Sequence, residues 1–156
     1  MKTFVTTALI ALFLAGCKSR ENLSKQEIIS QIADKIENQN YTFVPATAML
    51  ASGKFVSLGY PYSLSVSKDT VNSFLPYFGR AYVAPAPTDE GGIKFTSTDF
   101  DYTITKGKKD MWEAMIRPGD NWKRYTLVLQ IGDTGYTTLT VQDINRQTIS
   151  FYGKIE

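Results

Sequence analysis

The strongest constraint on the fold is an alternation of apolar and polar residues that runs through most of the chain after residue 40. Between 125 and 131, for example, every odd position is apolar and shares one face. A period of two is that of a β-strand with one buried side. Glycine-containing turns at 106–109, 118–121 and 132–135 separate such runs. The pattern predicts an antiparallel meander of roughly nine or ten strands, and therefore a mainly β domain folded as a sandwich or a partly closed barrel.

One helix is predicted before the strands, over residues 24–39. Ser24 and Glu27 have the spacing of a capping box, in which each side chain bonds a free amide of the first turn. An apolar stripe at helical spacing follows, and 38–40 (Asn-Gln-Asn) end the helix. We expect the stripe to dock on the sheet of the same domain, covering an end or an edge; a surface for a partner is the alternative. The stripe consists of Ile28, Ile29, Ile32, Ala33 and Ile36.

The first residues carry the three zones of an export signal. Lys2 is positive, residues 4–13 are charge-free and mostly apolar, and 14–17 read Leu-Ala-Gly-Cys. The apolar zone is too short to cross a bilayer core, which needs about 20 residues. Leu-Ala-Gly-Cys looks like a bacterial lipobox, in which the cysteine sulfur receives a diacylglyceryl group before cleavage. The sequence therefore predicts a lipoprotein signal peptide over 1–16 and lipidation of Cys17.

Lipidation also accounts for Cys17 being the only cysteine, so that no disulfide can form within the chain. Each buried CH₂ adds about 0.8 kcal/mol, and two or three acyl chains such as palmitate hold a protein stably on a membrane. Residues 17–23 are predicted to be a tether, and 24–156 a single domain. Some lipoproteins of this type carry an acidic signal for surface export just after the cysteine, and residues 18–21 match such a signal poorly. We therefore expect a cell-envelope protein, anchored to the outer membrane and facing the periplasm.

Composition excludes several kinds of chemistry. The chain has no histidine, which removes Ser-His-Asp and Cys-His catalysis and most zinc sites. Its formal net charge is only +2, so no long-range attraction to nucleic acid is expected. We predict no cofactor, no metal site, no nucleic-acid partner and no catalytic residues.

Three blocks of sequence carry a family resemblance. They are Leu75–Tyr82 (LPYFGRAY), Gly91–Phe95 (GGIKF) and Asn145–Gly153 (NRQTISFYG). Together they resemble a family of Bacteroides-type lipoproteins catalogued as domain of unknown function 4251, over a stretch from about Tyr41 to the end. The resemblance implies a β-rich envelope domain of a Gram-negative bacterium, and it implies no reaction.

The segment 74–82 is the best candidate for ligand contact. Tyr77, Phe78 and Tyr82 are rings that can stack on a sugar or an apolar ligand, and Arg80 supplies a planar fork of hydrogen-bond donors. The alternative is that the rings fill the core where Pro76 bends the sheet, and that Arg80 pairs with a carboxylate. Asn145 and Arg146 are a second candidate, for a carboxylate or a glycan; alternatively they fix the last turn. The two arginine-centred segments would strengthen each other if they met in space.

Three weaker candidates involve acids and a threonine. Asp99, Asp101 and Asp110 occupy positions 1, 3 and 12 of a calcium-loop frame, but Ile104 stands where that loop needs glycine. Asp99 and Asp101 also have a separation that would suit glycoside hydrolysis, as any strand with alternating acids does. Thr70, in the turn Asp-Thr-Val, is a candidate acceptor for an O-glycan.

Taken together, the sequence predicts a lipid-anchored envelope protein that is a non-catalytic binding or accessory module for an envelope glycan, a small molecule or a protein. The alternative is a structural lipoprotein whose sheet edge or striped helix docks on a partner complex. A histidine-free hydrolase that uses carboxylates is the weakest of the three hypotheses.

Overall fold

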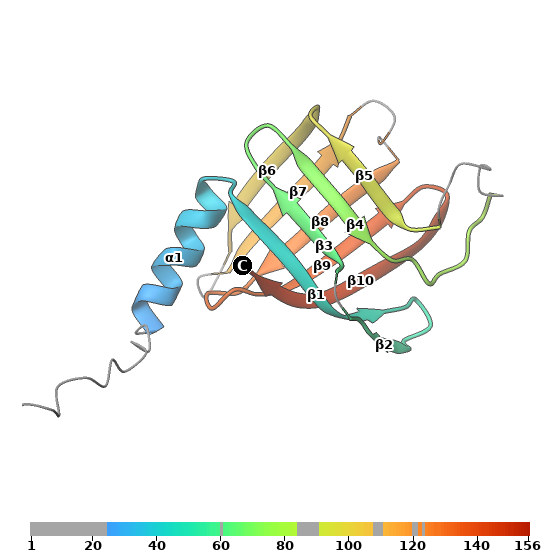
Figure 1. Cartoon of the computed structure of the whole chain (residues 1–156), viewed down its shortest axis with the longest axis horizontal. Coiled ribbons are helices and arrows are strands. Elements are labelled where there is room, and N and C mark those ends of the chain that lie inside the picture. Colours follow the sequence, from blue (N-terminus) through green and yellow to red (C-terminus); the bar gives the residue numbers. More distant parts are fainter. Residues whose placement is uncertain (1–24, 60, 84–90, 108–110, 120–121, 123) are drawn as a thin grey trace, which may run out of the picture.

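The computed structural model describes residues 25–59, 61–83, 91–107, 111–119, 122 and 124–156 (Figure 1). Within these residues it has one helix, α1 (Lys25–Glu37), followed by ten strands in one antiparallel sheet. The mainly β prediction and its strand number are thus confirmed. The strands are β1 (Tyr41–Met49), β2 (Phe55–Ser57), β3 (Ser63–Val66), β4 (Val71–Leu75), β5 (Ile93–Ser97), β6 (Phe100–Lys106), β7 (Trp112–Pro118), β8 (Tyr125–Ile131), β9 (Tyr136–Asp143) and β10 (Arg146–Ile155).

The sheet curls into a nearly closed barrel. Its strand order is β5-β4-β3-β1-β10-β9-β8-β7-β6, and β2 pairs with the far half of β1. The two edge strands, β5 and β6, are consecutive in the chain. In Figure 1, β3, β4 and β5 cross in front of β7 and β8. Of the two architectures that the sequence allowed, the barrel is therefore the one that forms.

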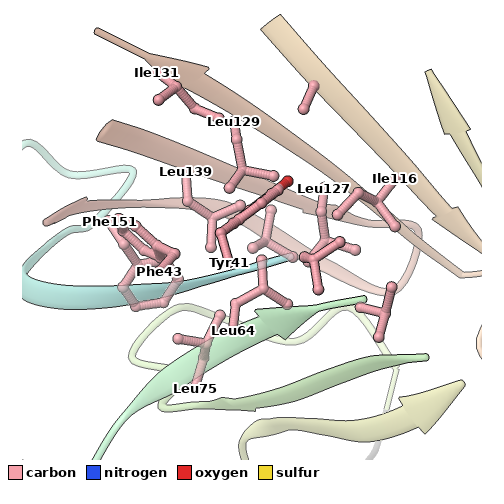
Figure 2. Packing of buried hydrophobic residues seen from close by; sticks show 14 of the residues in the cluster. Tyr41, Phe43, Leu64, Leu75, Ile116, Leu127, Leu129, Ile131, Leu139 and Phe151 are labelled. Carbon is pink, nitrogen blue, oxygen red and sulfur yellow. The ribbon is translucent and has the colours of Figure 1, made fainter. Parts of the chain in front are cut away.

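The interior of the barrel is a packed apolar core (Figure 2). The alternating positions of the sequence point into it, and the whole run from Tyr125 to Ile131 buries its odd positions as predicted. Burying a side chain of this size stabilises a fold by about 1.5–3 kcal/mol. The largest fully buried side chains are Phe43, Leu64, Leu75, Ile93, Ile116, Tyr125, Leu127, Leu129, Ile131, Leu139, Phe151 and, from the helix, Ile36.

A bulge in β1 explains how a proline fits inside the sheet. Pro45 pairs with Gly153 and Thr47 with Tyr152, so Ala46 is the extra residue. Proline lacks the N–H of a regular ladder and is tolerated at such positions. A Cβ on Gly153 would collide with the Val44 carbonyl oxygen and lie 2.7 Å from the Cα of Pro45. The close approach of the two backbones therefore requires glycine at position 153.

Helix α1 ends at Glu37, just before the Asn-Gln-Asn sequence at 38–40, and its end has a recognisable motif. Gln39 is left-handed, with a φ of 50°. The amide of Asn40 bonds the Lys35 carbonyl at 2.9 Å, and that of Gln39 bonds the Ile36 carbonyl at 3.1 Å. These two bonds are those of a Schellman cap. The predicted N-cap, Ser24, lies outside the described residues.

The apolar stripe of α1 docks on its own domain, as expected. Ile32 and Ile36 are buried, and Ile28 and Ala33 pack against the same core. A Cβ on Gly135, in the turn between β8 and β9, would lie 2.8 Å from Cδ1 of Ile32. The helix therefore covers part of one end of the barrel (Figure 1). No described helix is long and apolar enough to cross a membrane. The signal peptide, Cys17 and the tether lie outside the described residues.

Candidate functional site

The two arginine-centred segments of the sequence meet in space. Ala81 forms an isolated β-bridge with Arg146. On either side of it, the Tyr82 amide donates to the Asn145 carbonyl at 2.7 Å, and the Gln147 amide donates to the Arg80 carbonyl at 3.0 Å. The segment after β4 thus lies alongside the turn between β9 and β10, and these backbone bonds fix the two loops relative to each other.

Tyr77 and Arg146 lie beneath these loops and hold them together. Arg146 is buried; its guanidinium carbon lies 5.0 Å from the centre of the Tyr77 ring, and its Nη1 donates to the Gly92 carbonyl at 3.1 Å. The Tyr77 hydroxyl lies 2.9 Å from the Arg80 carbonyl oxygen and 3.0 Å from that of Gln147. Burial raises the pKa of Tyr77, and the nearby Arg146 charge opposes that rise. These two predicted ligand residues therefore form the scaffold of the site.

The charge of Arg146 is balanced by Asp143, at the end of β9. The Oδ2 atom of Asp143 lies 3.7 Å from Nε of Arg146 and 3.7 Å from Nε of Arg124. Its Oδ1 accepts the Asn145 amide at 2.9 Å, which fixes the turn. Arg124 also donates to the Tyr125 hydroxyl. The carboxylate thus sits between two guanidinium groups with 4 % of its side chain exposed.

Several other side chains of these two loops are exposed. We name them the distal surface: Phe78, Arg80, Tyr82, Val83 and Ile144. Tyr82 is 69 % exposed and Ile144 77 % exposed. Figure 1 shows the loops after β4 and between β9 and β10 at the end of the barrel opposite to α1. Of the six predicted contact residues, Phe78, Arg80 and Tyr82 are exposed, Tyr77 and Asn145 are half-buried, and Arg146 is buried.

The predicted glycan acceptor lies in the turn between β3 and β4. Thr70 is half-buried, and its amide donates to the Ser67 hydroxyl at 3.0 Å. Hydrogen bonds from Ser67 and then from Thr70 lower the pKa of the exposed Asp69 carboxyl. The turn is therefore a compact hydrogen-bonded unit at the barrel surface.

The predicted acids lie beside a small hollow. Asp99, Asp101 and Arg117 line a space of about 320 Å³ at the start of β6, where Asp101 and Arg117 are opposite each other in the register of β6 and β7. Within the described residues, no group of three potential metal ligands comes together. Asp110, the last position of the calcium-loop frame, lies outside the described residues. The Phe100–Ile104 run is strand β6, which is the structure that its alternation predicts.

A larger hollow lies on the outer wall of the barrel, and the sequence reasoning missed it. We name it the outer groove; it measures about 460 Å³ and crosses β1, β10, β9 and β8. Tyr136 and Tyr152 line it at outward-facing strand positions, together with Lys154. Aromatic residues on the polar face of an alternating strand were the signal that could have revealed it. The rest of its lining includes Val44, Ala46, Thr47, Met111, Gln130, Thr138 and Glu156.

Comparison with known proteins agrees with this fold. A family model described as a domain of unknown function (DUF4251) matches residues 23–155. A crystal structure of a DUF4251 family protein from Bacteroides eggerthii DSM 20697 is similar, with a TM-score of 0.59 and 12 % identity. The match covers 82 % of this chain and 86 % of that one. No curated protein matches the chain. Because the family model spans nearly the whole domain, the chain belongs to the DUF4251 family.

Proposed function

We propose that the protein is a lipid-anchored, non-catalytic binding module of the cell envelope, and that it docks a protein partner through its distal surface. The observation that carries the proposal is the combination of a rigid support with exposed apolar side chains. Buried Arg146 ties two loops together, and those loops present Phe78, Tyr82 and Ile144 to solvent.

The composition of the distal surface suits a protein interface. Tyrosine and arginine are enriched among the residues that dominate binding energy. Arg80 and Tyr82 flank Ala81, which bridges to Arg146 at the start of β10. Single exposed apolar residues are ordinary on a surface, but here several gather on two loops that are bonded to each other. Because the support is already formed, binding would cost little ordering of the backbone.

The position of the distal surface also fits a tethered protein. The predicted lipid on Cys17 precedes α1, and α1 lies at the opposite end of the barrel from the distal surface (Figure 1). A protein held by its helix end would therefore present these loops away from the membrane. The apolar stripe of the helix was the other surface considered for a partner. Because it packs on the core of its own domain, the distal surface is the better choice of docking site.

Co-purification from the native envelope tests this proposal. The tagged full chain is compared with the double variant Phe78→Ser and Ile144→Ser, and with Tyr136→Ala as a control on the outer wall. Quantitative mass spectrometry is expected to find one envelope protein that is retained by the parent and by Tyr136→Ala, and lost from the double variant. The same proteins recovered with all three chains would exclude the distal surface as the docking site.

A further inference from the structure

We infer that the outer groove is a second binding site, separate from the distal surface, and that its ligand is an uncharged sugar unit of a glycan. The groove lies on the side wall of the barrel, whereas the distal surface lies on the loops at one end. The inference goes beyond the proposed function, since either site can exist without the other.

The register of the sheet places two tyrosines diagonally across the groove. Tyr152 of β10 pairs with Thr138 of β9, and Lys154 of β10 pairs with Tyr136 of β9. Tyr136 is 69 % exposed and Tyr152 is 37 % exposed, and Nζ of Lys154 lies 5.6 Å from the centre of the Tyr136 ring, so a ligand would meet the exposed part of each ring beside the lysine. Residues on neighbouring strands at such a diagonal are within reach of one ligand molecule. The site therefore offers aromatic surface at two corners and polar groups at the other two.

The backbone beneath these side chains is fixed. All four belong to the paired strands β9 and β10, and the neighbouring β1 is held at the close contact between Val44 and Gly153. The Tyr152 hydroxyl donates to Sδ of Met49 at 3.6 Å, and the Tyr152 ring lies 6.2 Å from the ring of Phe55. A site on rigid strands holds its contacts more accurately than a site on loops.

The polar groups of the groove favour an uncharged ligand. Lys154 and Glu156 carry opposite charges, so the lining has no net charge to attract a phosphate or a carboxylate. Gln130 and Thr138 each supply both a donor and an acceptor, as the hydroxyl groups of a sugar require. A volume of about 460 Å³ falls in the range of small-molecule sites.

The shape of the groove argues against a lipid chain. It opens along the outer face of the sheet, so an acyl chain lying in it would keep one side in water. A pyranose ring differs in this respect, because its C–H face can stack on tyrosine while its hydroxyl edge stays hydrated. The combination of two rings, neutral polar groups and an open side therefore points to a sugar.

Saturation-transfer NMR on the lipid-bearing full chain in polyoxyethylene micelles tests the inference. The probes are neutral trisaccharides of glucose, galactose, mannose and N-acetylglucosamine, each up to about 10 mM, which detects millimolar affinity. At least one is expected to bind saturably. Tyr136→Ala should then weaken binding about tenfold or more, and Tyr136→Phe should retain it. Tyr82→Ala is the matched control, because Tyr82 has the same exposed fraction but lies on the distal surface.

Three results would overturn the inference. One is that none of the four sugars binds. Another is that a sugar binds equally well to the parent chain and to Tyr136→Ala. The third is that a fatty acid binds in a manner that depends on Tyr136 while the sugars do not. The variant with Phe78→Ser and Ile144→Ser tests protein docking and leaves the outer groove unchanged. Failure of the docking proposal is therefore distinguishable from failure of the sugar-binding inference.

Discussion

Arg146 stacks its guanidinium group on the ring of Tyr77, with 5.0 Å between the guanidinium carbon and the ring centre. The same arginine donates to the carbonyl of Gly92, which directly precedes β5. Both ends of the β4–β5 connection and the distant turn into β10 thus converge on one buried side chain. This convergence is what fixes the distal surface.

Replacing Arg146 should therefore destabilise the whole domain. Arg146→Met removes the bond to Gly92 and one of the two cations beside Asp143, and removal of one partner of a buried ion pair costs about 3 kcal/mol. Arg146→Lys should recover only part of the loss, because a lysine lacks the planar fork that stacks on Tyr77. Urea denaturation measures both variants. A change below about 1 kcal/mol for Arg146→Met would show that the arginine is not structural.

Gly153→Ala should be among the most damaging small substitutions in the barrel. The added methyl would meet the backbone of Val44 and Pro45, which cannot move without disturbing the β1 bulge. Overpacking of this kind costs about 2–3 kcal/mol. Gly59→Ala is the matched control, because nothing lies within 4 Å of a Cβ at that position. Equal unfolding free energies for the two variants would contradict the described register.

The stability of the barrel should fall in alkali because of its buried tyrosines. Burial raises the pKa of Tyr41 above its usual 10.0, and the charge and hydrogen bond of Tyr102 add to the rise. A pKa raised by folding gives stability that is complete below the unfolded value and is lost as pH rises past it. Unfolding free energy should therefore be level up to about pH 10 and decline above it.

The double variant Tyr41→Phe and Tyr102→Phe separates this effect from general alkaline damage. Its unfolding free energy, measured by urea denaturation at pH 8 and pH 11, should decline less between the two than that of the parent. An equal decline would place the alkaline sensitivity elsewhere, for instance at Tyr125, whose pKa burial also raises.

Cys17→Ala tests the predicted anchor. The mature N-terminal peptide of the parent should carry the mass of two or three acyl chains on Cys17, and the variant should carry none. Because a single chain binds only marginally and several bind stably, the parent should remain in the membrane fraction while the variant is released. Absence of any lipid mass on the parent, together with unchanged fractionation of the variant, would refute lipid anchoring.

Much of the fold follows from the residues alone, since strands that alternate cleanly bury what their pattern predicts. The run from Tyr125 to Ile131 and the helix stripe around Ile32 and Ile36 both do so. Strand β6 departs from its pattern: Ile104 faces the same side as Phe100 and Tyr102, yet it is 38 % exposed. The reason is topological, because β6 is an edge strand, and edge position depends on strand order rather than on local periodicity.

The candidate site was harder to predict, because its residues come together only through the pairing of segments that are distant in the sequence. The sequence singled out the segments around Arg80 and Arg146, and their pairing through Ala81 depends on the barrel as a whole. Burial of Arg146 depends in turn on Asp143, which no local pattern marks as its partner. The outer groove was missed because Tyr136 and Tyr152 become neighbours only in the register of β9 and β10.

Photo-cross-linking from the distal surface is the most direct test of the account. A benzophenone side chain replaces Tyr82 in one full-length chain and Lys68 in another, both exposed positions. Lys68 belongs to the turn between β3 and β4. Figure 1 shows this turn at the end of the barrel nearer to α1. Irradiation of intact cells should link position 82 to one envelope protein and position 68 to none. Adding Phe78→Ala to the chain with the probe at position 82 should abolish the link. No adduct from position 82, or the same adduct from both positions, would contradict docking through the distal surface.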